Sequence, residues 1–264
     1  MSFDSATAVA GGPGAWSAEL EAGWDIFGVT NGGYLMAIAA RAMQLESEDR
    51  SLISATGSFL NPATPGPVSI EVEVLKRGRS LSTLRATMRR DDTVLVYVTA
   101  AYSSPDRPVS DVTLSLGDPP DLPDPDDCII AEPATDAPIP PPFTGKVEMR
   151  ISPDDAAVFM SADGNQPRSR GWLRLRDGEQ LDANAVVLAT DAFAPAIFSS
   201  NLAVGWTPTV DLTVQVRDPH PTGWLACQFT TRFVSSGMLQ EDGEIWDQSG
   251  NLVALSRQLA LVPR

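Results

Sequence analysis

Two stretches of the chain carry the same sequence features in the same order and at a nearly constant spacing. The turn "PATPG", which begins at Pro62, corresponds to "PHPTG", which begins at Pro219, so the offset is 157 residues. The last apolar runs of the two stretches, "TVLVYVTAAY" from Thr93 and "NLVALSRQLA" from Asn251, lie 158 residues apart. A near-constant offset over a helix, turns and strands indicates a tandem repeat, so we expect two copies of one folding unit.

Each copy combines one helix with several strands. The helix-like segments are "NGGYLMAIAARAMQ" from Asn31 and "LDANAVVLATDAFAPAIFSS" from Leu181. Runs of alternating apolar and polar residues follow each of them, and a preceding strand is expected at 16–20 in the first copy and within 145–152 and 169–178 in the second. In the first copy, one strand face is formed by Val68, Ile70, Val72 and Val74. A mostly apolar helix followed by strands is buried only if the sheet curls around it. The pattern therefore predicts an α+β chain of two helices, each wrapped by a curved antiparallel sheet.

A segment rich in proline and aspartate separates the two copies. It runs from Pro105 to Pro142 and reads "PDRPVSDVTLSLGDPPDLPDPDDCIIAEPATDAPIPPP". Proline removes hydrogen-bond donors from a strand and fixes the backbone, so this segment is predicted to be an extended linker without helices or strands. The predicted organisation is an N-terminal unit at 1–104, a linker at 105–142 and a C-terminal unit at 143–264.

Composition excludes several classes of partner and cofactor. The net charge of −15 argues against nucleic acid or a membrane surface as a partner. No apolar run approaches the roughly 18 residues of a membrane span, and the N-terminus lacks the pattern of a signal peptide. The two cysteines, Cys128 and Cys227, fit a reducing, cytoplasmic setting and have no metal-ligand spacing. With His220 as the single histidine, no metal site and no cofactor are expected.

An anionic ligand would need a local basic patch on so acidic a chain. The candidate residues fall in two sequence clusters: Lys76, Arg77 and Arg79, and Arg168, Arg170, Arg174 and Arg176. Solvated strand ends and turns are the ordinary alternative for each of them.

Asp191 is a carboxylate in an otherwise apolar stretch of the sequence. Asp191 is the single charged residue of "VVLATDAFAPAIF", and a buried carboxylate is costly unless it is paired or hydrogen-bonded. Pro195 lies four residues later and has no N–H, so a helix through this segment would leave the carbonyl of Asp191 without its partner and would kink. The acid is thus expected inside a helix, either as a functional group or as one that faces a buried water or a neighbouring subunit.

The ordered motifs of the two copies resemble those of double-hotdog acyl-CoA thioesterases of the thioesterase II type. The resemblance covers nearly the whole chain. It rests on "FGVTNGGYLMAIAARAM", "SFLNPATPGPVSIEVEVLKRGRSLSTLRATMRRDDTVLVYVTAAY", "LATDAFAP", "TPTVDLTV" and "EIWDQSGNLVALSRQ". It implies hydrolysis of acyl-CoA thioesters, and it implies a homo-oligomer because hotdogs commonly continue their sheets across subunits.

The resemblance also assigns residues. The family's catalytic aspartate, threonine and glutamine fall on Asp191, Thr209 and Gln258, and Asp211 remains a competitor for a supporting role. Asp191 would orient and deprotonate a water that Thr209 and Gln258 hold, or would attack the thioester directly.

Backbone amides at the start of the first helix are candidates for binding the substrate oxyanion. They belong to Asn31, Gly32 and Gly33, where the two glycines permit close approach either of a ligand or of a packed neighbouring element. At an offset of 158, Gly33 corresponds to Asp191 and Ala100 to Gln258, so we expect one site per chain.

Two other functions remain open at this point. A hotdog hydratase or dehydratase acting on enoyl-CoA would pair an acid with a histidine, for which only His220 in a proline-flanked loop is available. A catalytically silent acyl-CoA-binding protein would keep the fold without turnover.

Overall fold

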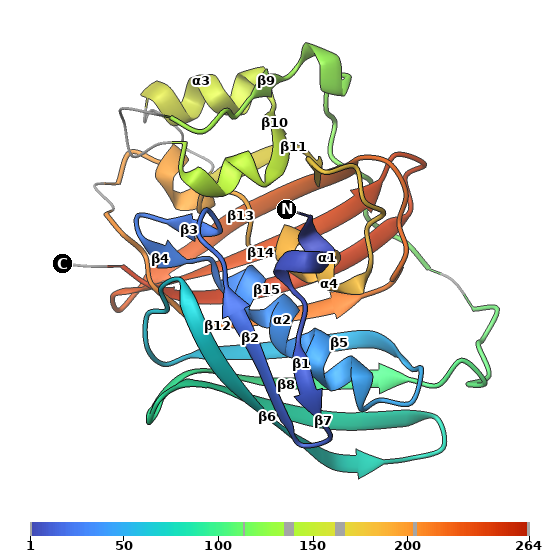
Figure 1. Ribbon diagram of the computed structural model, residues 1–264. Helices are drawn as coiled ribbons and strands as arrows, with labels where there is room; N and C mark the ends of the chain where they lie inside the picture. The colour runs from blue at the N-terminus through green and yellow to red at the C-terminus, as the bar shows by residue number, and fades with distance from the viewer. Residues whose placement is uncertain (1, 113, 135–139, 162–166, 203–204, 263–264) are drawn as a thin grey trace.

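The two units share one long antiparallel sheet. In the computed structural model, which describes residues 2–112, 114–134, 140–161, 167–202 and 205–262, thirteen strands follow one another in the order β1-β2-β6-β7-β8-β5-β12-β15-β14-β13-β11-β10-β9. Reading outward from the β5–β12 junction, the two halves of the sheet have matching strand orders. Figure 1 shows the first half and the second half curving around the two central helices from opposite sides.

The elements of the first half are α1 (Phe3–Ala6), β1 (Ala10–Gly12), β2 (Ala15–Leu20), β3 (Asp25–Ile26), β4 (Val29–Thr30), α2 (Gly32–Leu45), β5 (Ser51–Phe59), β6 (Gly66–Arg77), β7 (Leu81–Arg90) and β8 (Thr93–Ser103). Those that follow are η1 (Pro125–Asp127), β9 (Ile129–Ile130), η2 (Pro142–Gly145), β10 (Val147–Ile151), α3 (Pro153–Ser161), β11 (Arg168–Leu175), α4 (Ala183–Ala189), η3 (Ala196–Ser199), β12 (Thr209–Val216), β13 (Leu225–Ser235), β14 (Met238–Asp247) and β15 (Leu252–Leu261).

The repeat predicted from the sequence is visible at the junction of the halves. Strands β5 and β12 pair antiparallel with Thr56 opposite Thr213, and the two hydroxyl oxygens are 3.0 Å apart. These residues are 157 positions apart, which is the offset of the turns. The strands therefore repeat as predicted, and the expected α+β double hotdog is confirmed.

The central helices do not follow that offset. Helix α2 starts at Gly32, within one residue of the prediction, but α4 starts at Ala183, which is 151 residues later. The second helix was predicted to continue through Asp191, and this is wrong: α4 ends at Ala189 with Thr190 as its C-cap, and Asp191 lies in the turn that follows. Counted from the helix starts, Asp191 corresponds to Ala40, so the equivalence of Gly33 with Asp191 is also wrong. The two helices run antiparallel, with the start of α2 beside the end of α4.

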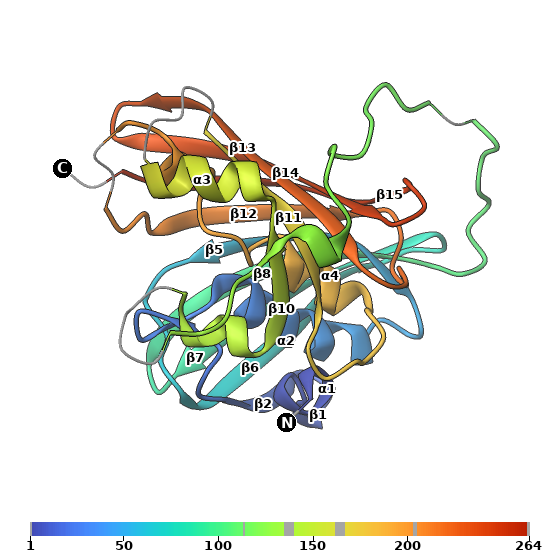
Figure 2. The same ribbon diagram turned by 90° about the horizontal axis from the view of Figure 1, so that it is seen from above.

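The proline-rich segment is only partly a linker. Residues 105–112 and 114–124 are mostly exposed and extend away from the two halves in Figure 2. Beyond them the prediction of a segment without elements is wrong, because β9 pairs with β10 and Pro125 and Cys128 are buried. Residues 113 and 135–139 lie outside the described residues. The division at 1–104, 105–142 and 143–264 stays a prediction.

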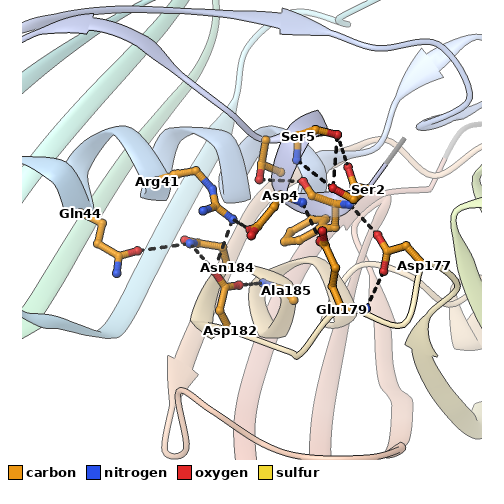
Figure 3. A network of polar contacts seen from close by, with 12 residues as sticks. Ser2, Asp4, Ser5, Arg41, Gln44, Asp177, Glu179, Asp182, Asn184 and Ala185 are labelled. Atoms are coloured by element: carbon orange, nitrogen blue, oxygen red, sulfur yellow. Dashed lines mark hydrogen bonds and ion pairs between the residues drawn. The ribbon is translucent and has the colours of Figure 1, made fainter.

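Polar contacts fix one end of the helix pair. The guanidinium of Arg41 on α2 donates to Asp4 at 2.8 Å and to Asp182 at 3.3 Å, and Asn184 donates to Gln44 at 3.2 Å (Figure 3). Asp182 is also the N-cap of α4, where its carboxylate accepts from the amide of Ala185 at 2.8 Å. This network holds the start of α4 against the end of α2.

We expect Asp182→Ala to lower the free energy of unfolding by about 1–3 kcal/mol, because it removes a helix cap together with the contacts to Arg41 and Asn184. The matched control is Asp4→Ala, which removes only the more exposed ion pair and should cost at most about 1 kcal/mol. Urea unfolding followed by circular dichroism measures both. Equal losses in the two variants would contradict the role given to Asp182.

Candidate active site

The turn after α4 brings Asp191 to the first turn of α2. Asn31 caps α2 by accepting from the amide of Tyr34 at 2.9 Å, and its side-chain amide then donates to the Asp191 carbonyl at 2.8 Å and to Oδ2 at 3.1 Å. The carbonyl predicted to lack a helical partner thus obtains one from the other half of the chain. Asn31 therefore couples the start of α2 to the position of the acid.

The carboxylate of Asp191 is held on one side only. Oδ2 accepts from the Gly33 amide at 2.8 Å as well as from Asn31. Oδ1 of Asp191 has no hydrogen-bond partner among the described residues. It is also not fully occluded by neighbouring atoms. One oxygen is fixed at the positive end of α2, and the other remains available to a molecule in the adjoining cavity.

Gly32 and Gly33 make this approach possible. A Cβ on Gly33 would lie 2.9 Å from the Cβ of Asp191 and 3.0 Å from the Leu188 carbonyl oxygen. A Cβ on Gly32 would lie 2.9 Å from Oδ2 of Asp191. The glycines thus accommodate the packed end of α4 and the acid itself. The Gly33 amide, expected to face the substrate oxyanion, is instead bound to Asp191.

Burial makes the carboxyl group of Asp191 a weaker acid. Removal from bulk water raises the pKa of Asp191 from 3.8 to about 6, while the amides of Gly33 and Gly32 and the side chain of Asn31 hold it down. The carboxyl group is therefore ionised at neutral pH but remains a stronger proton acceptor than an exposed aspartate.

Thr209 and Gln258 come together through a strand irregularity. The pairing of β12 with β15 shifts register between Thr209 and Asp211, as in a β-bulge, while Leu212 stays opposite Gln258. Such a bulge turns Thr209 to the face that carries Leu212 and Gln258, although strict alternation would have turned it away. The side-chain amide of Gln258 donates to the hydroxyl oxygen of Thr209.

The three predicted residues line one cavity. It has a volume of about 750 Å³, and Asp191, Thr209 and Gln258 all contribute to its wall. Most of the remaining lining is apolar, including Phe59, Met149, Phe159, Phe193, Phe198 and Phe229. The arrangement offers an acyl-sized apolar space with a carboxylate, a hydroxyl and an amide on its surface.

Other candidate residues are not brought to the cavity. Neither Asp211 nor the exposed His220 is among the residues that line it. In the basic clusters, Arg77 pairs with Glu48 and Arg174 with Glu148. Only Arg168 of these seven residues reaches the cavity wall, where it pairs with the buried Asp155 at 3.1 Å.

The sequence patterns did not single out Glu241 as a residue of the site. Glu241 lies on β14, is 6% exposed and lines the same cavity. Leu239, Glu241, Gly243 and Ile245 alternate on the buried face of β14, so the period of two already places Glu241 inside. That signal was available in the sequence.

Comparison with known proteins agrees with this geometry. The family model for the acyl-CoA thioesterase N-terminal domain matches residues 20–103, and the model for the acyl-CoA thioesterase C-terminal domain matches residues 119–262. The chain belongs to the acyl-CoA thioesterase family.

Individual relatives of this acyl-CoA thioesterase chain extend over nearly all of it. A crystal structure of a proposed thioesterase II from Thermobifida fusca is 33% identical, with a TM-score of 0.88 over 99% of this chain and 97% of that one. A hot dog protein of unknown function from Alicyclobacillus acidocaldarius shares the fold at 24% identity, with a TM-score of 0.82 over 99% and 98% of the two chains. An uncharacterised protein of Mycobacterium tuberculosis is 26% identical over 93% of this chain and 90% of its own length.

Family and fold confirm the expectation of a thioester hydrolase of the acyl-CoA thioesterase family. Among the helices of the described ranges, none has both the length and the apolar character needed to cross a membrane.

We expect Asp191 to lower the free energy of unfolding of this thioesterase at neutral pH. Because folding raises the pKa of Asp191, the folded chain binds that proton more tightly than the unfolded chain, and this contribution to stability is lost as the pH rises from about 4 to about 6. Asp191→Asn should therefore be more stable than wild type at pH 8 by about 1–3 kcal/mol, and the difference should shrink toward pH 4. Urea unfolding at both pH values measures it, and a variant less stable than wild type at pH 8 would contradict the expectation.

Proposed function

We propose that the chain hydrolyses acyl-CoA thioesters to a free acid and CoA by means of a water molecule that Asp191 activates. The observation that carries the proposal is the one-sided anchoring of the carboxylate: Oδ2 is fixed by Asn31 and Gly33, and Oδ1 is left open beside an apolar cavity. A base held in this way keeps its orientation while one oxygen can accept a proton.

Thr209 and Gln258 would position the water. The Thr209 hydroxyl oxygen already accepts from Gln258, so its own proton can be donated to a neighbouring oxygen, and the amide oxygen of Gln258 can accept from the same water. With Oδ1 of Asp191 this would place three polar groups around one molecule. Attack of that water on the thioester carbonyl, with proton transfer to Asp191, would release the thiol.

The setting proposed for this reaction rests on the composition of the chain and on its family. The substrate is an acyl-CoA ester, the compartment is the cytoplasm and the chain assembles as a homo-oligomer. Hydrolysis of such esters would belong to fatty acid metabolism. Phenylalanine and methionine side chains that line the cavity support an acyl group as the buried part of the substrate.

We expect Asp191→Asn to reduce thiol release from straight-chain acyl-CoA esters by about 10²–10⁴-fold, because the amide cannot accept the proton. The matched control is Asp211→Asn, which changes a nearby acid of β12 that does not line the cavity, and it should keep activity near that of wild type. A thiol-reactive dye measures both. Undiminished turnover in Asp191→Asn would remove the proposed mechanism, and tight ester binding without thiol release by wild type would indicate a silent binding protein.

The proposed base should also set the acid side of the pH profile. Because the pKa of Asp191 is about 6, kcat should rise as the pH increases through 6 and the carboxylate becomes ionised. Residual turnover by Asp191→Asn should lack this rise. A profile for wild type that is flat from pH 5 to pH 7 would contradict the assignment.

A further inference from the structure

Glu241 is a second carboxyl group in the wall of the cavity. Its Oε2 accepts from the Ala196 amide at 2.6 Å and from the Thr231 hydroxyl at 3.4 Å. Oε1 has no partner among the described residues and is not one of the fully occluded polar atoms. The side chain is therefore anchored through one oxygen, while the other can contact a ligand in the cavity.

The strand register places Glu241 beside the proposed reacting groups. It lies directly opposite Gln258 in the pairing of β14 with β15, and Gln258 contacts Thr209. Side chains directly opposite each other in antiparallel strands have Cβ atoms about 5 Å apart. The charge of Asp191 acts on Glu241 as well, so the two acids share one environment.

Thioester hydrolysis needs a donor for the negative charge that develops on the carbonyl oxygen. The backbone amides expected for this role at the start of α2 are engaged elsewhere. That of Asn31 donates to the Trp24 carbonyl and that of Gly33 to Asp191, and the Gly32 amide also acts on the Asp191 carboxylate, whose pKa it lowers. The hydroxyl of Ser199, also in the cavity wall, has its single proton engaged, since it lies 2.7 Å from the carbonyl oxygen of Ala196 and 3.1 Å from that of Arg168.

Burial and charge favour the protonated form of Glu241. Burial and the charges of Asp191 and Asp242 raise its pKa to about 7, against the lowering effect of the Ala196 amide and the Thr231 hydroxyl. The other charged groups nearby are already paired: Arg168 pairs with Asp155, and Arg232 and Arg257 pair with Asp242. Between about pH 6 and pH 7, Asp191 is mostly ionised while Glu241 is mostly protonated.

We propose that Glu241 is a further catalytic residue, whose protonated carboxyl group donates a hydrogen bond from Oε1 to the carbonyl oxygen of the bound thioester. This role rests on the proposed hydrolysis. The water oxygen bonds to the carbonyl carbon and its proton passes to Asp191. Glu241 keeps its own proton while its hydrogen bond stabilises the oxyanion. The carbon–sulfur bond then breaks and the departing thiolate takes the proton from Asp191, which gives one carboxylic acid and one thiol.

Two variants of Glu241 test this role. In Glu241→Gln the amide oxygen can accept from Ala196 and Thr231, and the amide NH₂ replaces Oε1 as a donor at every pH. In Glu241→Leu no donor remains. The assay is thiol release from straight-chain acyl-CoA esters, with kcat and KM measured from pH 5 to pH 9.

For wild type we expect kcat to fall above about pH 7, as Glu241 ionises and its charge opposes the oxyanion. Glu241→Gln should lose this fall and remain within about tenfold of wild type at pH 6.5. Glu241→Leu should lose about 10²–10³ in kcat at all pH values, with little change in KM. Asp242→Asn is the matched control on the opposite face of β14. It should keep the fall, moved slightly to lower pH because the charge of Asp242 no longer raises the pKa of Glu241.

A purely structural role for Glu241 would give a different result. If its carboxylate only holds Ala196, then Glu241→Gln should keep the wild-type pH profile, and that outcome overturns the proposal even if Glu241→Leu fails to fold. An active wild type together with an unchanged profile in Glu241→Gln would overturn the role of Glu241 alone. A wild type that releases no thiol from any ester would overturn the proposed hydrolysis as well.

Discussion

The contact between Asp191 and the first turn of α2 organises the site. A carboxylate in an apolar setting is stabilised by amides from the other half of the chain, and the same amide nitrogen of Asn31 also satisfies the backbone carbonyl of Asp191. The two central helices must lie antiparallel for this contact to form. The polar network at their far end, around Arg41 and Asp182, supports the same orientation.

The sequence predicted the strands better than the helices. The strand repeat depends on alternation and turn residues, which are local, and it reappears in the pairing of Thr56 with Thr213. The extent of α4 depends on where the chain must turn to meet α2, and composition alone could not distinguish a helix through Asp191 from one that ends before it. The proline-rich segment was misjudged for a related reason, because β9 exists only through its pairing with β10.

The sequence predicted which three residues line the candidate site, but it did not predict all the contacts that these residues make. Asp191, Thr209 and Gln258 line one cavity. The bulge in β12 that allows Thr209 to face Gln258 has no evident signature in the sequence, and the partner of the Gly33 amide follows from tertiary contacts. Glu241 could have been found, because a charged residue on the inward face of an alternating strand is unusual. Strand position thus complements the hydrophobicity of neighbouring residues, which singled out Asp191, as a guide to buried acids.

The continuity of the sheet through the β5–β12 junction has a consequence for solubility. Each half would end in a long strand of exposed hydrogen-bonding groups if it stood alone, but the junction satisfies both strands. At the two ends of the described sheet are β1 and β9, which have only three and two residues. Joining the halves within one chain therefore removes two long strand edges on which a foreign strand could nucleate, which reduces the exposure of so extended a sheet to edge-to-edge aggregation.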